Sequence, residues 1–124
     1  MSSAPAPTLY DRLGGIVSID VAVDRLYDRM IGDPELAHFF DDVDLPQLRA
    51  HQKSFLATAL GGTDAYDGRS LRDAHRHLTI SDHHVDRMVG HLAAALAILG
   101  VSPGLIEEVV AAVDALRGAV LGRD

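Results

Sequence analysis

The stretch DLPQLRAHQKSFLATALGG, residues 44–62, decides the fold class because its apolar residues recur with the period of an α-helix. Asp44 is a suitable N-cap with Gln47 three residues later as its capping-box partner, and the Gly61–Gly62 pair ends the helix. One face of this helix combines apolar side chains with a single amide, at Leu45, Leu48, Gln52, Phe55 and Ala59. The stretch therefore predicts an amphipathic helix with one polar group in its buried face.

Helical signals continue in both directions from this stretch. The further predicted elements are helices over residues 9–13, 16–31, 71–77, 81–99 and 103–121, a short turn from Asp33–Pro34 to His38–Phe39–Phe40, and a loop over residues 63–69. Their inward faces are expected to contain Ile19, Val23, Leu26, Tyr27 and Met30, then Val85, Met88, Val89, Leu92 and Leu96, then Ile106, Val109, Val110, Val113 and Leu116. No segment alternates like a strand for a useful length. The sequence predicts an all-α fold.

The composition fits one small domain with an aliphatic core. The chain has 124 residues, of which 48% are hydrophobic and only 5% aromatic. We expect a flexible tail over residues 1–8 and a single domain over residues 9–124. The chain has no cysteine, which excludes disulfides, thiolate metal sites and thiol catalysis.

The charge and hydropathy patterns exclude two classes of partner. The formal net charge of -7 gives no general attraction to nucleic acid or to anionic membranes. No run approaches the roughly 18 apolar residues of a membrane span, and residues 1–8 do not have the pattern of a signal peptide. We therefore expect a cytoplasmic protein without nucleic-acid binding or membrane insertion.

Two polar groups interrupt otherwise apolar helix faces, Tyr27 and Gln52. Taken singly, Gln52 could satisfy a nearby backbone group, and Tyr27 could be a core tyrosine whose hydroxyl reaches the surface. On helices that face each other, the two side chains form a small polar spot in an apolar cavity, which is the usual composition of a small-ligand site.

Among the seven histidines, His75 has the surroundings of an axial iron ligand. It lies on a short predicted helix between Leu71 and Leu78, and a neutral imidazole among aliphatic side chains suits this role. The alternative is a buried histidine bonded to a backbone carbonyl. His83, His84 and His91 are expected to be solvated or to make local hydrogen bonds.

The order of these residues resembles the group I truncated haemoglobins, close to the cyanobacterial and actinobacterial type. The similarity runs from about Leu9 to Leu121 and rests on the motifs LYDRLGG (9–15), Tyr27, HFF (38–40), RAHQKSFL (49–56), ALGG (59–62), YDG (66–68), AHRHL (74–78), GHL (90–92) and Gly100–Val101. Each motif is weak alone, but together they occur in order and with matching spacing. The resemblance implies a truncated globin, in which a two-over-two helical sandwich surrounds a haem b.

The resemblance also implies roles for individual residues. His75 is the proximal iron ligand, Phe40 packs against the haem face, and Tyr27 and Gln52 form the distal pair that hydrogen-bonds an iron-bound ligand. Leu48 occupies the place where many globins have a distal histidine. The haem-contacting residues expected on this basis are Phe40, Leu48, His51, Phe55, Leu71, Arg72, His75 and Leu78.

Two positions keep alternatives open, and one feature departs from the cyanobacterial pattern. His51 matches a histidine that binds iron from the distal side in cyanobacterial members, but it can instead point outward towards a haem propionate. Arg72 is either a second propionate partner or a surface arginine. Cyanobacterial relatives can link haem covalently through a histidine on the last helix, whereas residues 103–121 contain none here. The haem is therefore expected to be non-covalent.

The resemblance leaves three functions open for a protein that binds O2, NO and CO. The first is a nitric oxide dioxygenase, which converts nitric oxide and O2 to nitrate and needs an external reductase. The second is a module that stores, delivers or senses O2. The third is a six-coordinate electron-transfer or peroxide-handling protein, which depends on His51.

Two readings outside the globins have less support. A carboxylate-bridged di-iron bundle needs two Glu-x-x-His motifs, and only Glu35–His38 provides one. A plain helical interaction domain remains the other alternative, because the haem itself rests on the resemblance.

Overall fold

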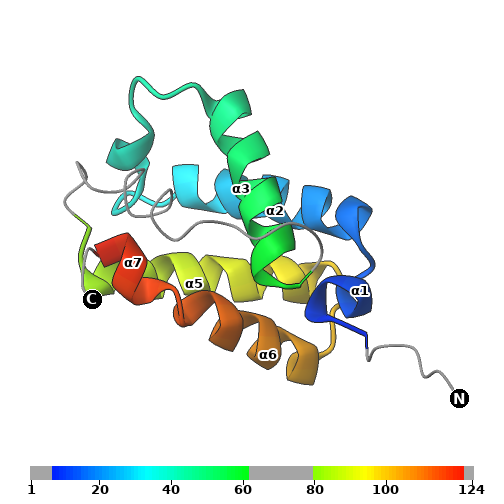
Figure 1. The fold of residues 1–124 in the computed structure, drawn as a ribbon. Helices are drawn as coiled ribbons and strands as arrows, with labels where there is room; N and C mark the ends of the chain where they lie inside the picture. Colours follow the sequence, from blue (N-terminus) through cyan, green and yellow to red (C-terminus); the bar gives the residue numbers. More distant parts are fainter. Residues whose placement is uncertain (1–6, 62–79, 122–124) are drawn as a thin grey trace, which may run out of the picture.

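The computed structural model describes residues 7–61 and 80–121. The elements in these ranges are α1 (Leu9–Leu13), α2 (Ile16–Ile31), the 3-10 helix η1 (Ala37–Phe40), α3 (Leu45–Ala59), α5 (Asp82–Ile98), α6 (Pro103–Asp114) and α7 (Arg117–Leu121). Helices α2 and α3 form one layer over α5 and α6, and the described ranges contain no strand (Figure 1). The all-α fold class is confirmed.

The predicted loop over residues 63–69 and the predicted helix over residues 71–77 lie outside the described residues, as does most of the expected tail. The division into a tail and a single domain stays a prediction. No helix in the described part of the chain is long and apolar enough to cross a lipid bilayer.

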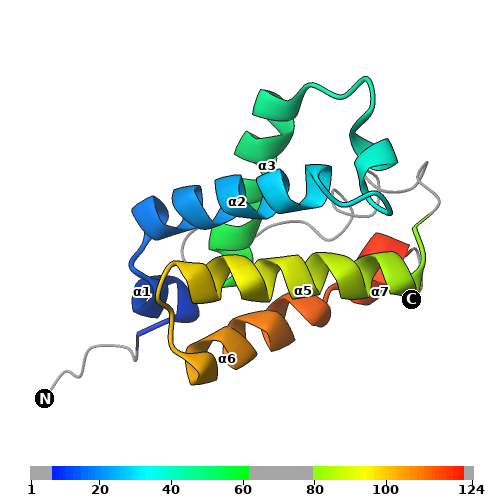
Figure 2. The same ribbon diagram turned by 180° about the vertical axis from the view of Figure 1, so that it is seen from behind.

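The core lies where α2 meets the lower layer. Ile19 and Val23 of α2 are fully buried, as are Leu92 of α5 and Val109 of α6. Figure 2 shows α5 lying between α2 and α6, so its apolar side chains pack against both helices. The predicted inward faces of α2, α5 and α6 thus supply the core, with Met88 and Val89 half-buried at its margin.

The face of α3 differs from the prediction. Its buried side chains are Leu56 and Ala57, followed by Leu60 just after the helix, while Leu48 and Gln52 are half-buried. The first half of α3 therefore leaves part of its apolar face uncovered by the described residues. Only the second half packs into the closed core.

The last predicted helix is divided in two. A continuous helix over residues 103–121 was expected, but α6 ends at Asp114 and α7 begins at Arg117. The Arg117 guanidinium is held by Asp114 and Asp86, at 2.6 Å each, and by Asp82 at 3.0 Å. The helix break lets one arginine join α7 to the first turn of α5.

Helix α1 joins the two layers at one end of the molecule. The Tyr10 amide donates to the Leu60 carbonyl at 3.0 Å, while the Arg12 guanidinium makes two hydrogen bonds to Glu108 of α6, at 2.7 and 3.0 Å. Gly61 has a φ of 91°, and a Cβ there would lie 3.1 Å from Thr8 side-chain atoms. Glycine at this position allows α1 to approach the end of α3 closely.

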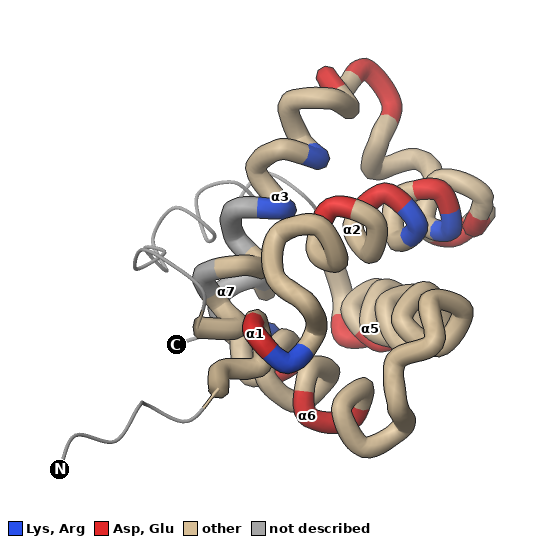
Figure 3. The backbone as a smooth tube through the Cα atoms, turned by 90° about the vertical axis from the view of Figure 1, so that its right-hand side faces the viewer, with Lys and Arg blue, Asp and Glu red and all other residues tan. Residues whose placement is uncertain are grey.

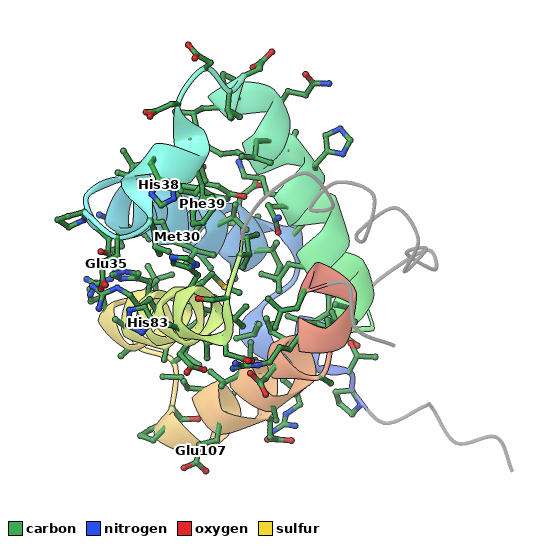
Figure 4. All side chains as sticks on the ribbon, turned by 90° about the vertical axis from the view of Figure 1, so that its left-hand side faces the viewer. Met30, Glu35, His38, Phe39, His83 and Glu107 are labelled. Atoms are coloured by element: carbon green, nitrogen blue, oxygen red, sulfur yellow. The ribbon has the colours of Figure 1, made fainter. Side chains whose placement is uncertain are left out.

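Asp33 anchors the turn after α2 to α5. Its side chain is only 1% exposed and accepts hydrogen bonds from Arg87 at 2.8 Å and from the His91 imidazole at 2.7 Å. It also accepts from the Glu35 amide within the turn. Hydrogen bonds from Arg87 and His91 hold the pKa of the Asp33 carboxyl well below its usual range. Figure 4 shows Glu35 and His83 at this end of the molecule, where their side chains pair at 3.0 Å.

Asp33→Asn is expected to lower the free energy of unfolding at neutral pH, because a neutral amide accepts weaker hydrogen bonds from Arg87 and His91. A carboxyl whose folded pKa is depressed stabilises the protein above its unfolded pKa of about 3.9, and this contribution is lost as the pH falls further. Urea unfolding should therefore show a difference between wild type and variant at neutral pH that shrinks progressively below about pH 4.

Glu35→Gln is the matched control, because Glu35 pairs with the same Arg87 but is half exposed. Its effect on unfolding should be small. An Asp33→Asn difference that stays constant with pH would contradict the assigned role of the carboxylate.

Candidate functional site

Tyr27 lies at the centre of the candidate site, on the side of α2 that faces α3. It is 2% exposed, and the edge of its ring meets Phe40 of η1 with centroids 5.6 Å apart and planes at 77°. The side chain of Gln52 lies close enough to its phenol to lower the pKa of that group slightly. The structure thus brings together three of the predicted site residues, Tyr27, Phe40 and Gln52, from three separate elements.

The elements place these side chains through helix periodicity. Tyr27 follows Val23 by one turn of α2, so it continues a buried stripe and turns its polar end towards α3. On α3, Leu48 and Gln52 are four residues apart and therefore share a face. Leu48, Phe39 and Phe40 pack against the core while remaining half-buried. The result is an apolar wall, formed by Leu48, Phe39 and Phe40, that is interrupted by the polar pair Tyr27 and Gln52.

Burial raises the pKa of the Tyr27 phenol far above its ordinary value, and the nearby Arg49 charge and the Gln52 hydrogen bond lower it only in part. The hydroxyl therefore keeps its proton across the physiological pH range. Tyr27 is a permanent hydrogen-bond donor at this wall.

The structure adds Arg49 to the site, a residue that the sequence analysis did not single out. Its guanidinium lies over the Tyr27 ring, 5.7 Å from the centroid, and pairs with Asp24 and Asp28 of α2. A usable signal was present in the sequence, because Arg49 precedes Gln52 by three residues and thus shares its helix face.

The remaining predicted site residues fall into three groups. His75, Arg72, Leu71 and Leu78 lie outside the described residues, and only the helical backbone of Phe55 is described. His51 lies on α3 and is exposed, and its pairing with a propionate stays a prediction. Its role as a sixth ligand stays a prediction.

The described side chains fit the haem that the resemblance implies. The half-buried apolar wall suits a flat apolar ring, and the Tyr27–Gln52 pair supplies the few polar groups that such a site needs. No group of three or more His, Cys, Asp or Glu in the described ranges could hold a bare metal ion. A porphyrin supplies four nitrogen ligands itself, so one imidazole is sufficient.

His83, His84 and His91 make local contacts, as predicted. The His84 ring bonds Ser81 in the capping box of α5, and His83 and His91 pair with Glu35 and Asp33. Nδ1 of His91 is buried and has no hydrogen-bond partner among the described residues. Glu35, the carboxylate of the di-iron alternative, is engaged by Arg87 as well as His83, which gives that alternative no support.

A separate apolar cavity of about 200 Å³ lies away from the Tyr27 wall, towards the beginning of α2 and the end of α5. Its lining is aliphatic except for Ser18, and it includes Leu56, Leu92, Leu96 and Val109. None of the predicted site residues whose side chains the structure describes lines it.

Comparisons with known proteins agree with this geometry. The model of the bacterial-like globin family matches residues 8–122. The chain is 46% identical over 112 residues to the group 1 truncated hemoglobin GlbN of Synechocystis, which covers 87% of this chain and 90% of that protein. It is 34% identical over 113 residues to the protein of the same name from Mycolicibacterium paratuberculosis, which covers 91% of this chain and 83% of that protein.

Solved structures show the same similarity in three dimensions. The 2/2 hemoglobin from Synechococcus, in the cyanomet state and with covalently attached heme, matches with a TM-score of 0.87 at 38% identity, over 94% of this chain and 99% of that chain. The Fe(III) form of truncated hemoglobin from Tetrahymena pyriformis matches with a TM-score of 0.86 at 32% identity, over 92% of this chain and 97% of that chain. The similarity covers nearly the whole chain in sequence and in fold.

Proposed function

The chain belongs to the bacterial-like globin family as a group 1 truncated haemoglobin, and from this we propose that it binds haem b through His75 and converts nitric oxide and O2 to nitrate. The observation that carries the proposal is the buried Tyr27 hydroxyl beside Gln52, within an apolar wall. A fixed donor in such surroundings suits a small ligand that gains negative charge on binding.

Haem supplies, when bound, the iron at which O2, NO and CO are held. His75 would supply the imidazole that holds the iron, and Leu71, Leu78, Phe40, Leu48 and Phe55 would contribute apolar contacts to the haem. Arg72 and His51 pair with the propionates, and the exposure of His51 on α3 supports its assignment to that role. Residues 103–121 contain no histidine, so the haem is held without a covalent link to the last helix.

The distal pair divides two tasks. Tyr27 would donate a hydrogen bond to the bound ligand and keep its proton, and Gln52 would fix the direction of that hydroxyl. A hydrogen bond to a charged acceptor contributes about 1.5–3 kcal/mol, which corresponds to roughly tenfold or more in the rate of ligand release. The surrounding apolar side chains exclude water that would compete for the same hydrogen bond.

The reaction balances with one electron, because nitric oxide, O2 and one electron together give nitrate. We assign the supply of that electron to an external reductase. We place the reaction in the cytoplasm, the location that the sequence predicts.

Storage or sensing of O2 is the second candidate, since a buried donor that slows ligand release serves it equally well. Sustained turnover with a reductant separates the two functions.

His75→Gly is expected to abolish stoichiometric haem binding, because it removes the proximal imidazole, and added imidazole should partly restore the absorption spectrum. His77→Gly is the matched control and should retain haem. A His75→Gly protein that keeps haem with an unaltered spectrum would overturn the assignment of the proximal ligand.

Tyr27→Phe is expected to speed O2 release from the reduced protein by roughly tenfold or more, because the hydrogen bond to the ligand is lost. Stopped-flow measurement of O2 displacement by carbon monoxide tests this. Tyr10→Phe, on α1, is the control and should release O2 at the wild-type rate. An unchanged rate in Tyr27→Phe would refute the distal pair.

Wild-type protein given nitric oxide, O2 and a one-electron reductant is expected to form many equivalents of nitrate per haem. Without the reductant, nitrate formation should stop at about one equivalent, since each nitrate requires one electron. Nitrate assay with a nitric oxide electrode provides the measurement. Formation that stops after one equivalent despite available reductant would favour storage or sensing.

A further inference from the structure

We infer that Arg49 is a positioning residue for the distal pair: it fixes the ring of Tyr27 and strengthens the hydroxyl as a donor to the bound ligand. The inference rests on the proposed role of Tyr27. It concerns a side chain that touches neither the ligand nor the haem in the arrangement proposed above, and that acts through its contact with the tyrosine ring.

The guanidinium of Arg49 is held at both ends. Nη1 lies 3.2 Å from Oδ1 of Asp24, and Nη2 lies 3.1 Å from Oδ1 of Asp28. These carboxylates stand on successive turns of α2, on either side of Tyr27 in the sequence. A planar group bound at two points has little freedom to rotate, so the cation stays over the ring, 5.7 Å from its centroid.

Three contacts from three elements then determine where the Tyr27 hydroxyl points. Arg49 covers the ring, Phe40 meets it at 77°, and Gln52 lies beside the phenol. Arg49 and Gln52 lie three residues apart on α3, so they share a helix face. Arg49 contacts the ring of Tyr27 from this face, and Gln52 contacts its hydroxyl. A change in the Arg49 contact therefore alters the direction of the donor, even though Gln52 remains in place.

The charge of Arg49 acts in the same direction as its packing. Its side chain is only 23% exposed, so water screens its field less than that of a surface arginine. The positive charge lowers the pKa of the Tyr27 phenol against the larger effect of burial. A more acidic hydroxyl donates a stronger hydrogen bond to a negatively charged acceptor.

Lys53 provides a control within the same helix. It follows Arg49 by one turn and pairs with Asp20 at 3.6 Å and with Asp24 at 3.4 Å. Figure 3 shows the basic positions of α3 beside the acidic positions of α2. Both cations tie α3 to α2, but Arg49 is the one placed over the Tyr27 ring. Their comparison separates an effect on the tyrosine from a general loosening of the two helices.

The experiment compares Arg49→Met, Arg49→Lys and Lys53→Met as haem-loaded proteins. Arg49→Met is expected to release O2 about two- to fivefold faster than wild type, the range of an exposed to partly buried cation–π contact. The C–O stretch of the reduced protein saturated with carbon monoxide should move to higher wavenumber, because the positive field near the ligand weakens. Lys53→Met should leave both quantities unchanged.

A third readout reports on the ring itself. In the carbon monoxide form, ¹³C-labelled tyrosine gives signals from only three tyrosines, and Tyr27→Phe identifies the one of interest. Arg49→Met should increase the rate at which the Tyr27 ring flips. Arg49→Lys keeps the charge but cannot bridge Asp24 and Asp28 as a planar fork, so its ring should also flip faster while its C–O stretch stays nearer to wild type.

The outcomes distinguish this inference from the proposed function. If Tyr27→Phe speeds O2 release while Arg49→Met changes neither the C–O stretch nor the ring, Arg49 does not position Tyr27 and the distal pair stands. If Lys53→Met reproduces the effects of Arg49→Met, the ion pairs act only by joining the helices, and the inference is wrong. In support of it, Arg49→Met should add no further acceleration in a Tyr27→Phe background.

Discussion

The packing of α2 between α3 and α5 is the contact on which the rest of the molecule depends. Its aliphatic stripe, with Ile19 and Val23 fully buried, meets the lower layer. One turn beyond Val23 the same stripe includes Tyr27, which turns towards α3. Hydrophobic burial therefore fixes the position of the Tyr27 hydroxyl, and few further contacts within the site are needed to hold it there.

The chemistry of the site follows from a difference in burial between the two halves of α3. The second half closes the core with Leu56, while the first half leaves Leu48 and Gln52 half-buried. An apolar surface that the described residues leave open is costly in water unless something flat and apolar covers it. A haem meets this need, and the Gln52 amide contributes directionality where a purely apolar wall could give none.

The helices themselves could be predicted because their ends are marked by local signals. Ser81 and Ser102 cap their helices through side-chain hydrogen bonds within three residues, and such contacts depend only on nearby sequence. The pairing of Tyr27 with Gln52 could be inferred because both interrupt apolar faces. The break before Arg117 and the ion pairs of Arg49 could not, since both depend on carboxylates brought close only by folding. Periodicity identifies which side of a helix is apolar, but not which charged side chain a neighbouring helix will offer.

The link between α1 and both layers has a consequence for how the molecule opens. A helix of five residues is far too short to persist alone in water, so α1 owes its order to Leu60 on one side and Glu108 on the other. Separation of the two layers removes one of these supports and must release α1 as well. The amide protons of this short helix thus exchange with solvent on the timescale at which the two helical layers separate. Hydrogen exchange in α1 therefore measures the opening of the whole fold.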